Sequence, residues 1–201
     1  MIEIDRQKIY ESHGYKFKNF ICLTDEEKRM VLQWRNHKIV RNKMVNKEPI
    51  SLESHLLYIE SLKTRTDCYY WLVYYPDGAP IGVLDLLHVD KENDTAEFGE
   101  YLNPDTAGLG FEFLIECNFF IFGILKLGNN LLTVNVNNKE VLLFVKYTGG
   151  SFEGIEQIGE ESFYVSKHAN GDYILKNYNK LSLLDYARFI KKNRNNINFN
   201  I

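Results

Sequence analysis

Residues 95–127 set the tightest limit on the architecture, because three unlike segments follow one another directly. The segment TAEFGEYLN (95–103) alternates polar and apolar residues, which predicts a half-buried strand. The segment FEFLIECNFFIFGILKL (111–127) is mostly apolar and predicts a buried helix. Gly108 and Gly110 lie in the turn between them. A strand, a glycine turn and a helix start can together bind an anion through exposed backbone N–H groups.

The composition limits the class of protein. The chain has 201 residues, so we expect one domain over residues 1–190 with a polar C-terminal tail at 191–201. The net charge of −3 offers no basic face to nucleic acid. The three cysteines lack metal-ligand spacing, so we expect reduced thiols and neither a disulfide nor a zinc site. There is no apolar signal core and no run of about 18 apolar residues, which predicts a cytoplasmic protein without membrane association.

The other segments predict a mixture of strands and helices. Thr24 and Ser51 each precede a helical pattern and are expected to cap it. CYYWLVYY (68–75) and APIGVLDLLHVD (79–90) flank a Pro-Asp-Gly turn and predict a hairpin. Further strands are expected at 15–23, 129–137, 151–159, 161–173 and 172–178, with a short glycine-terminated helix at 139–150. This order predicts a single α/β or α+β domain.

Five segments carry a resemblance to a known family, and together they cover roughly residues 15–154. They are WRNHKIVRNKM, ISLESHLLYIESL, PIGVLDLLHVD, FGEYLNPDTAGLGFEFLIE and VNVNNKEVLLFVKYTGGSFEG. In this order they resemble the GCN5-related N-acetyltransferases, and among these the enzymes that acetylate nucleotide-linked amino sugars. Within that group they are similar to the enzymes that acetylate the 4-amino group of a UDP-linked dideoxy-altrosamine for pseudaminic acid synthesis.

The resemblance implies a fold, a co-substrate and a binding mode. It implies a mixed, mostly antiparallel sheet flanked by helices, with acetyl-CoA as co-substrate and no metal. Two strands would splay apart to admit the pantetheine arm, and the pyrophosphate would lie on the loop at residues 107–111. The cofactor-binding residues would be Tyr101, Leu102, Ala107, Gly108, Leu109, Gly110, Phe111 and Asn138. Asn138 has two open readings, a contact to the pantetheine arm and a cap of the short helix.

Two positions depart from the family pattern. The phosphate loop usually carries basic or amide side chains, whereas this chain has Asp105, Thr106, Ala107 and Leu109 there. The closing helix of the family often carries a tyrosine that protonates the leaving thiolate. The ungapped match puts Val145 at that position, and Tyr147 would serve if the helix were shifted by two residues.

Two carboxyl groups are candidates for the general base. Glu100 lies on the predicted strand 95–103 beside Phe98 and Tyr101, and partly apolar surroundings would raise its pKa. The alternative for Glu100 is a solvated, outward position. Asp85 interrupts an apolar strand, so it needs either a structural hydrogen bond or a contact with the acceptor.

The acceptor side is assigned from the two N-terminal segments. By resemblance, Arg35 and His55 would hold a nucleotide diphosphate, although alone each would suit a surface or capping position. Tyr101 would stack on uracil or sugar, or belong to the core. His88 is assigned to the acceptor side with them.

The leading hypothesis is direct acetyl transfer from acetyl-CoA to the amine of a nucleotide-linked amino sugar. One alternative keeps the fold and changes the acceptor to a protein N-terminus or another small amine. A second alternative is a non-catalytic acyl-CoA-binding protein. A homodimer is one arrangement that the sequence leaves open.

Overall fold

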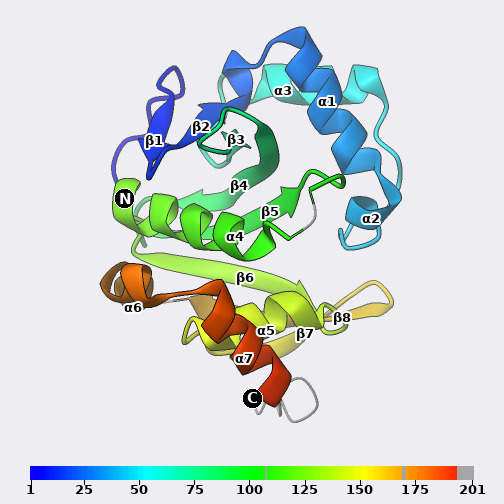
Figure 1. Cartoon of the computed structure of the whole chain (residues 1–201). Helices are drawn as coiled ribbons and strands as arrows, with labels where there is room; N and C mark the ends of the chain where they lie inside the picture. Colours follow the sequence, from blue (N-terminus) through cyan, green and yellow to red (C-terminus); the bar gives the residue numbers. More distant parts are fainter. Residues whose placement is uncertain (107, 169–170, 194–201) are drawn as a thin grey trace.

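The structure is a computed structural model that describes residues 1–106, 108–168 and 171–193. Within these residues, eight strands form one sheet in the order β1-β2-β3-β4-β5-β6-β8-β7 (Figure 1). The strands are β1 Tyr10–Ser12, β2 Tyr15–Asn19, β3 Tyr69–Tyr74, β4 Pro80–Asp90, β5 Thr95–Leu102, β6 Asn129–Asn135, β7 Gly154–Ile158 and β8 Glu161–His168. Neighbouring strands are antiparallel, except that β5 and β6 are parallel. The predicted mixed, mostly antiparallel sheet is confirmed.

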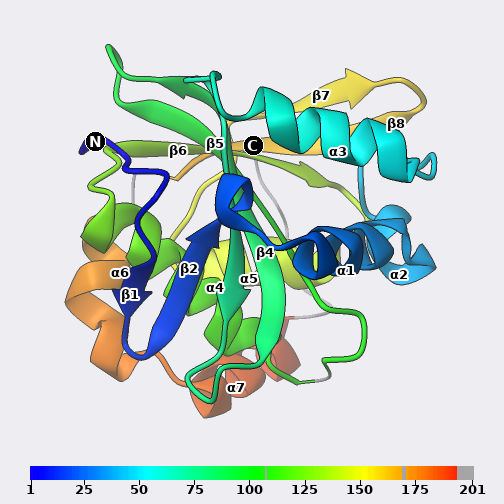
Figure 2. The ribbon, with the colours of Figure 1, turned by 90° about the horizontal axis from the view of Figure 1, so that it is seen from above.

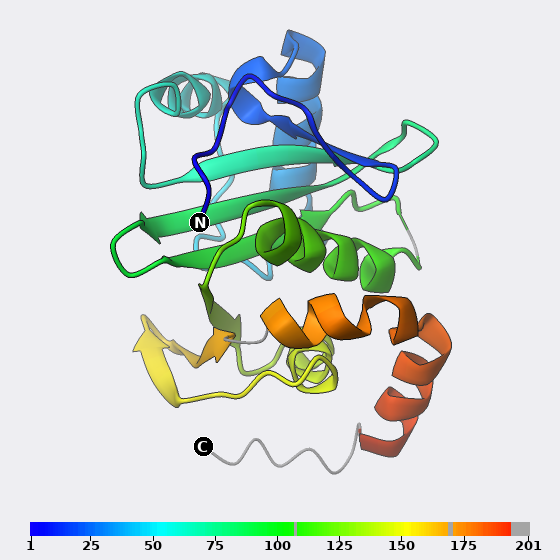
Figure 3. The same ribbon diagram turned by 90° about the vertical axis from the view of Figure 1, so that its left-hand side faces the viewer.

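Helices cover both faces of this sheet. They are α1 Asp25–Asn36, α2 Lys38–Arg41, α3 Leu52–Ser61, α4 Gly110–Phe119, α5 Lys139–Tyr147, α6 Gly171–Asn177 and α7 Leu183–Asn193, with the helical turns η1 Phe20–Cys22, η2 Phe120–Ile124 and η3 Tyr178–Lys180. Figure 3 shows α1 and α3 on one side of strands β3 to β5 and α4 on the other side. In Figure 2, α2 lies beyond the end of α1.

The predicted helix starts are confirmed at α1 and α3. The Thr24 side chain accepts from the Glu27 backbone N–H, and the Glu27 carboxylate accepts from the Thr24 N–H, which completes a capping box. At α3, the Ser51 hydroxyl accepts from the Ser54 N–H at 3.1 Å. Local sequence signals therefore fix where these two helices begin.

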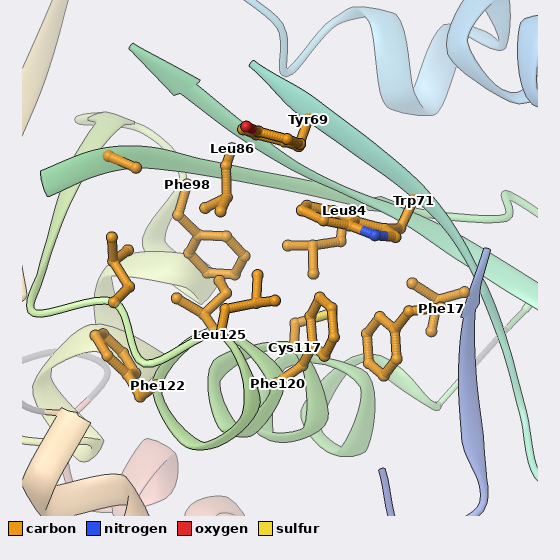
Figure 4. Packing of buried hydrophobic residues seen from close by; sticks show 14 of the residues in the cluster. Phe17, Tyr69, Trp71, Leu84, Leu86, Phe98, Cys117, Phe120, Phe122 and Leu125 are labelled. Atoms are coloured by element: carbon orange, nitrogen blue, oxygen red, sulfur yellow. The ribbon is translucent and has the colours of Figure 1, made fainter. Parts of the chain in front are cut away.

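The sheet separates two apolar clusters. The larger cluster fills the space between the sheet and α4, where Phe17 and Phe120 stack with ring centroids 4.0 Å apart beneath Trp71 (Figure 4). The smaller cluster joins α1 and α3 to the opposite face, through residues such as Trp34 and Leu62. Each strand contributes alternate side chains to the two clusters, so the parity of a strand residue decides the face on which its side chain lies.

The C-terminal region differs from the prediction. The strand expected at 172–178 is wrong, because residues Gly171–Asn177 form α6, which contacts α4 and η2 and buries Ile174 fully. No edge is free for such a strand beside β8, since β8 already pairs with β6 and β7. The first three residues of the predicted tail, 191–193, complete α7, and residues 194–201 lie outside the described residues.

Two further findings concern the cysteines and the helices. Cys22, Cys68 and Cys117 are free thiols, and the last two are buried. Across residues 1–106, 108–168 and 171–193, every helix is too short or too polar to cross a membrane.

Candidate active site

The parallel strands β5 and β6 part after a short pairing. Their register joins Thr95 to Asn129, Ala96 to Asn130 and Glu97 to Leu131, and β5 then continues for five residues without a partner in β6 among the described residues. On its other side β5 stays paired with β4 as far as Leu102. The strands therefore open a gap in the middle of the sheet.

The backbone of β5 faces this gap at alternate residues. The Asn103 N–H donates to the Ile81 carbonyl of β4 at 2.8 Å, so the polar backbone groups of odd-numbered β5 residues point to β4. Those of Glu100 and Leu102 consequently point into the gap. Unpaired strand backbone of this kind is a ready partner for an extended ligand.

A recess lies beside the gap on the side of α4 and α5. It is small, and its lining consists of Phe98, Glu100, Leu114, Asn118, Leu132, Val141, Phe144 and Val145. Glu100 is the ionisable member of this lining. Burial, followed by the nearby charge of Asp85, raises the pKa of Glu100 to about 8.

Asp85 lies on the opposite face of the sheet from the recess. It pairs with Gly99 of β5, and a Cβ at position 99 would come within 2.6 Å of the Asp85 carboxyl. The absence of a side chain at Gly99 therefore makes room for this carboxyl group. Burial and the adjacent Glu97 raise the pKa of Asp85 to about 7, while Arg35 lowers it.

Arg35 and Arg41 bring positive charge to the same face. The Arg35 Nη2 atom donates to the Asn46 carbonyl at 2.8 Å. The Arg35 Nη1 and Arg41 Nε atoms are buried and have no hydrogen-bond partner among the described residues. Burial lowers the pKa of Arg35, and Tyr101, Tyr70 and Asp85 oppose this effect. Two neighbouring guanidinium groups thus hold unused donors, and one of them, that of Arg35, acts on the Asp85 carboxyl.

The loop after α2 ties the two halves of the divided sheet together. Lys43 lies 3.5 Å from Glu140 at the start of α5, and Lys47 lies 2.7 Å from Glu161 of β8. These ion pairs are partly exposed, so each contributes at most about 1 kcal/mol. They hold the loop across the side of the gap that carries Arg35 and Arg41.

The start of α4 has the form expected of an anion site. Gly108 has φ +86°, and a Cβ there would meet no atom within 4 Å. Leu109 is the N-cap residue and gives no side-chain cap, so the first N–H groups of the helix have no side-chain partner among the described residues. Phe111 is buried and Gly110 lies next to the Leu102 side chain, while Ala107 lies outside the described residues.

Asn138 occupies the N-cap position of α5 but makes no side-chain cap. Its backbone N–H donates to the Asn135 carbonyl at 2.8 Å, and its carbonyl accepts from Leu142 at 3.1 Å. The half-buried Asn138 amide is therefore not committed to capping. The side-chain cap is thus not formed, and the contact of Asn138 to the pantetheine arm stays a prediction.

The structure does not bring three of the predicted residues into the recess or the charged cluster. His55 is buried, and its Nε2 atom lies 3.0 Å from the Lys28 carbonyl, which ties α3 to α1. Tyr147 points to α7, with its hydroxyl 3.5 Å from the Ser182 carbonyl. His88 is exposed at φ +50° in a bulge of β4.

His88 nevertheless contacts a residue next to Asp85. Its Nδ1 atom lies 2.9 Å from Glu97 Oε2, and Glu97 is the carboxylate whose charge raises the Asp85 pKa. Tyr101, being odd-numbered, lies on the face of Asp85 rather than on the recess side. Of its two predicted contacts, cofactor and acceptor, the position suits the acceptor.

Sequence reasoning missed four residues that shape the site. They are Arg41, Tyr70, Glu97 and Asn118. Arg41 belongs to the segment WRNHKIVRNKM and follows Arg35 by six residues, which was a usable signal. Glu97 and Tyr70 could have been found by pairing the strands, because each faces Asp85 from a neighbouring strand. Asn118 lies in a buried helix and gave no signal.

The described part of the chain holds no group of three or more His, Cys, Asp and Glu side chains arranged for a metal ion. The arrangement offers a gap with unpaired backbone and an apolar recess with one carboxyl group on one face. The other face carries Asp85 and Glu97 together with Arg35, which lies near Arg41.

No protein-family model matches the chain, but individual relatives do. Acetyltransferase PseH from Campylobacter jejuni serotype O:2 is 33% identical over 127 residues, which span 63% of this chain and 78% of the relative. The crystal structure of C. jejuni N-acetyltransferase PseH in complex with acetyl coenzyme A has a TM-score of 0.58 at 25% identity, covering 76% of this chain and 96% of that one. Spermidine N-acetyltransferase from Vibrio cholerae, solved with CoA and spermine, has a TM-score of 0.70 at 17% identity over 81% and 99% of the two chains, a likeness of fold alone.

The similarity to acetyltransferase PseH, together with the fold shared with the solved N-acetyltransferases, identifies the chain as an N-acetyltransferase of the GCN5-related class. The resemblance seen in the sequence is confirmed at this level. The chain belongs to the family of acetyltransferase PseH, because the similarity extends over more than two thirds of that relative's length.

Proposed function

We propose that this enzyme transfers the acetyl group of acetyl-CoA to the amine of a nucleotide-linked amino sugar, as in a pseudaminic acid-type pathway. The observation that carries the proposal is the pair of neighbouring arginines, Arg35 and Arg41, each with one buried nitrogen that has no hydrogen-bond partner among the described residues, together with the effect of Arg35 on the Asp85 carboxyl. Guanidinium groups bind diphosphates through charge-assisted hydrogen bonds. The carboxyl group of Asp85 could bind the acceptor amine.

The donor side is supported by the gap, the recess and the start of α4. The backbone of Glu100 and Leu102 would hydrogen-bond the amides of a pantetheine arm, and Asn138 lies at the far side of the gap. The uncapped N–H groups after Gly108 would bind the pyrophosphate through backbone donors and the helix dipole. Acetyl-CoA supplies the activated acetyl group as a thioester. The relative solved with acetyl coenzyme A supports the same donor here.

The acidic side chains near this loop set the mode of pyrophosphate binding. Asp105 and Glu112 are both exposed close to the start of α4. Their charges repel a diphosphate, so the affinity would rest on backbone N–H groups and not on side chains. This departure from the family pattern makes the two glycines of the loop more important.

The acceptor side is supported by the face of the sheet that carries Asp85. Arg35 and Arg41 would hold the diphosphate, and Tyr101 would pack against the base or the sugar. The amine must be neutral when it attacks the thioester, which requires a proton acceptor on this face. We assign this role to Asp85, the carboxyl group of this face on which Arg35 acts.

Acetylation assays with matched acceptors test the proposal. The release of CoA would be measured with a UDP-linked 4-amino-4,6-dideoxy sugar, with the same sugar lacking the nucleotide, with spermidine and with a peptide bearing a free N-terminus. We expect kcat/KM for the nucleotide-linked sugar to exceed that for the free sugar by roughly 100-fold, because two charged contacts are lost with the diphosphate. A preference for spermidine or the peptide would contradict the acceptor class. Acetyl-CoA binding without any transfer would favour the non-catalytic alternative.

A further inference from the structure

Two carboxyl side chains lie next to each other along the β4–β5 pair but on opposite faces of the sheet. Asp85 lies across Gly99, as the 2.6 Å approach of its carboxyl to a Cβ at that position requires. Glu100 follows Gly99 in the strand and therefore points to the other face, where it lines the recess. One carboxyl is thus on the side of the two arginines, and the other is on the side of α4 and α5.

Resting on the proposed acetyl transfer, we propose that the two faces divide the proton transfers. Asp85 accepts the proton of the acceptor amine, and Glu100 donates a proton to the sulfur of the leaving thiolate. Glu100 thereby acts as the general acid, the role that the family resemblance assigns to a tyrosine.

The surroundings of Glu100 suit a proton donor. The recess is apolar except for Asn118, and the Asn118 amide is already committed to the Leu114 carbonyl at 2.7 Å. Two titratable groups lie close enough to Glu100 to interact with its charge. They are Asp85, on the other face of the sheet, and the buried thiol of Cys117 on α4. Burial raises the Glu100 pKa to about 8, so the group carries its proton at neutral pH. A general base would need the opposite state.

The helix α5 offers no competing acid in the recess. Among the α5 side chains that line the recess, Phe144 and Val145 are the closest in sequence to Tyr147. Tyr147 itself packs between Phe111 and Tyr186, in the cluster beneath α7. Its hydroxyl is directed to the Ser182 carbonyl, away from the gap.

The surroundings of Asp85 suit a proton acceptor. The charged and titratable groups facing it are Arg35 from α1, Tyr70 from β3, and Glu97 and Tyr101 from β5. Arg35 favours the ionised carboxylate, whereas burial and Glu97 oppose it, so the pKa of Asp85 is about 7. A group that ionises near neutrality can take up a proton and release it again.

The atoms of the step balance. A bond forms between the amine nitrogen and the carbonyl carbon of the thioester, and the bond between that carbon and sulfur breaks. The proton lost by nitrogen passes to the Asp85 carboxylate, and the proton of Glu100 passes to sulfur, which leaves the amide and the free thiol of CoA. The return of one proton from Asp85 to Glu100 then restores the starting state of both carboxyl groups.

The pH dependence of kcat/KM distinguishes an acid from a base. With the amino-sugar acceptor, the wild type should show an ascending limb from Asp85 and a descending limb above about pH 8 from Glu100. Glu100→Gln should lower kcat by roughly 10²–10⁴-fold and abolish the descending limb. Asp85→Asn should instead remove the part of the ascending limb that comes from the enzyme and leave the part that comes from the ionisation of the acceptor amine. Glu156→Gln, an exposed glutamate of β7, is the control and should keep both limbs.

A Glu100→Gln variant that keeps the descending limb, or that loses the ascending one, would overturn the assignment. The second measurement needs no turnover: ¹³C NMR titration of the carboxyl groups in the wild type, with Glu100 and Asp85 identified through the two variants. We expect the Glu100 signal to titrate above neutrality. Titration of Glu100 below pH 5 would refute its role as acid. Failure of the wild type to acetylate any amino sugar would instead contradict the proposed function, while the NMR result would still decide the protonation of Glu100.

Discussion

Arg35 combines a fixed position with a free donor. It lies in the last turn of α1, where one guanidinium nitrogen holds the Asn46 carbonyl and another has no partner among the described residues. If that donor binds the acceptor diphosphate, Arg35→Met should raise the acceptor KM by roughly 10- to 100-fold, because a hydrogen bond to a charged group contributes about 1.5–3 kcal/mol. The affinity for acetyl-CoA should stay nearly unchanged, since the donor lies on the opposite face. Steady-state kinetics and calorimetric titration measure the two quantities.

Arg29→Met provides the matched control for this prediction. Arg29 belongs to the same helix and is exposed, so its loss removes an equal charge without entering the cluster. We expect wild-type constants from it. An acceptor KM that is unchanged in Arg35→Met, or that rises equally in both variants, would show that Arg35 does not bind the acceptor.

His55 is expected to act on stability and not on acceptor binding. The sequence suggested a diphosphate contact, but the ring is buried against the Lys28 carbonyl. His55→Ala removes that hydrogen bond and the buried ring that joins α3 to α1, which should lower the free energy of unfolding by about 1–3 kcal/mol. For a chain of this size, the thermal midpoint should fall by roughly 3–10 °C. A raised acceptor KM with an unchanged midpoint would restore the original assignment.

The same residue predicts a dependence of stability on acid. Burial lowers the pKa of His55 below its ordinary value of 6.5. Below about pH 6.5 the unfolded chain therefore binds a proton at this residue that the folded protein resists, so stability falls as the pH falls and levels off below the folded pKa. Denaturant unfolding at pH 7.5 and 5.5 should show a smaller loss in His55→Ala than in the wild type. Equal losses would mean that the ring is not held neutral.

At the scale of elements, the turn before α4 has a backbone conformation that favours glycine. Gly108 has φ +86° with open space where a Cβ would point, so glycine is needed there for conformation or for a ligand. Gly108→Val should weaken acetyl-CoA binding by about tenfold or more, because the turn is strained and the Cβ obstructs the approach of the diphosphate. Calorimetric titration with CoA measures this loss.

Gly78 offers a control with nearly the same geometry. It has φ +89°, also with no atom within 4 Å of a Cβ, and it lies in the hairpin turn between β3 and β4. Gly78→Val should therefore carry the same backbone strain and lose stability without losing affinity for CoA. If both variants bind CoA equally well, the pyrophosphate does not lie on the α4 turn.

Local signals explain which elements were predictable. The caps of α1 and α3, the hairpin turn and the glycine after α5 are each encoded within a few residues, and the structure has them where they were predicted. Helix α6 was mistaken for a strand because its aromatic and branched residues favour strands in isolation, while burial against α4 decides its conformation. Helix α7 was not assigned, although Ser182 and Asp185 form a cap that was visible three residues apart.

The sequence predicted which segments carry the site residues, but not on which face of the sheet each residue lies. The sequence placed Glu100 and Asp85 on neighbouring strands and treated them as rivals for one task. Strand alternation alone places Glu100 on the same face as Phe98, and Asp85 on the same face as Val83. It does not say which helices cover each face, and these helices decide which face belongs to the recess and which to the arginines. The opening of β5 from β6 depends on pairing over long sequence distances, which no local pattern reports.

At the scale of the whole molecule, the sheet is the partition between two binding surfaces. The helices α1 to α3 cover the side with the arginines, and α4 and α5 cover the side with the recess (Figure 1). The C-terminal helix α7 packs outside α5, and its Tyr186 stacks on Phe111 at the start of α4 with centroids 5.0 Å apart. The last described element therefore supports the helix start that would hold the donor.

This arrangement predicts that damage at the C-terminus reaches the donor side selectively. Tyr186→Ala removes a buried ring from contact with Phe111, Phe144 and Tyr147, which should destabilise the fold by about 3 kcal/mol. Because Phe111 then loses its support, CoA should bind several-fold more weakly, whereas the acceptor KM at saturating donor should change little. Tyr186→Phe keeps the ring and loses only the hydrogen bond to the Glu140 carbonyl, so it should cost about 1 kcal/mol and preserve CoA affinity. Denaturant unfolding and calorimetric titration of both variants measure these effects. Full CoA affinity in a destabilised Tyr186→Ala would show that α7 stabilises the fold without supporting the donor site.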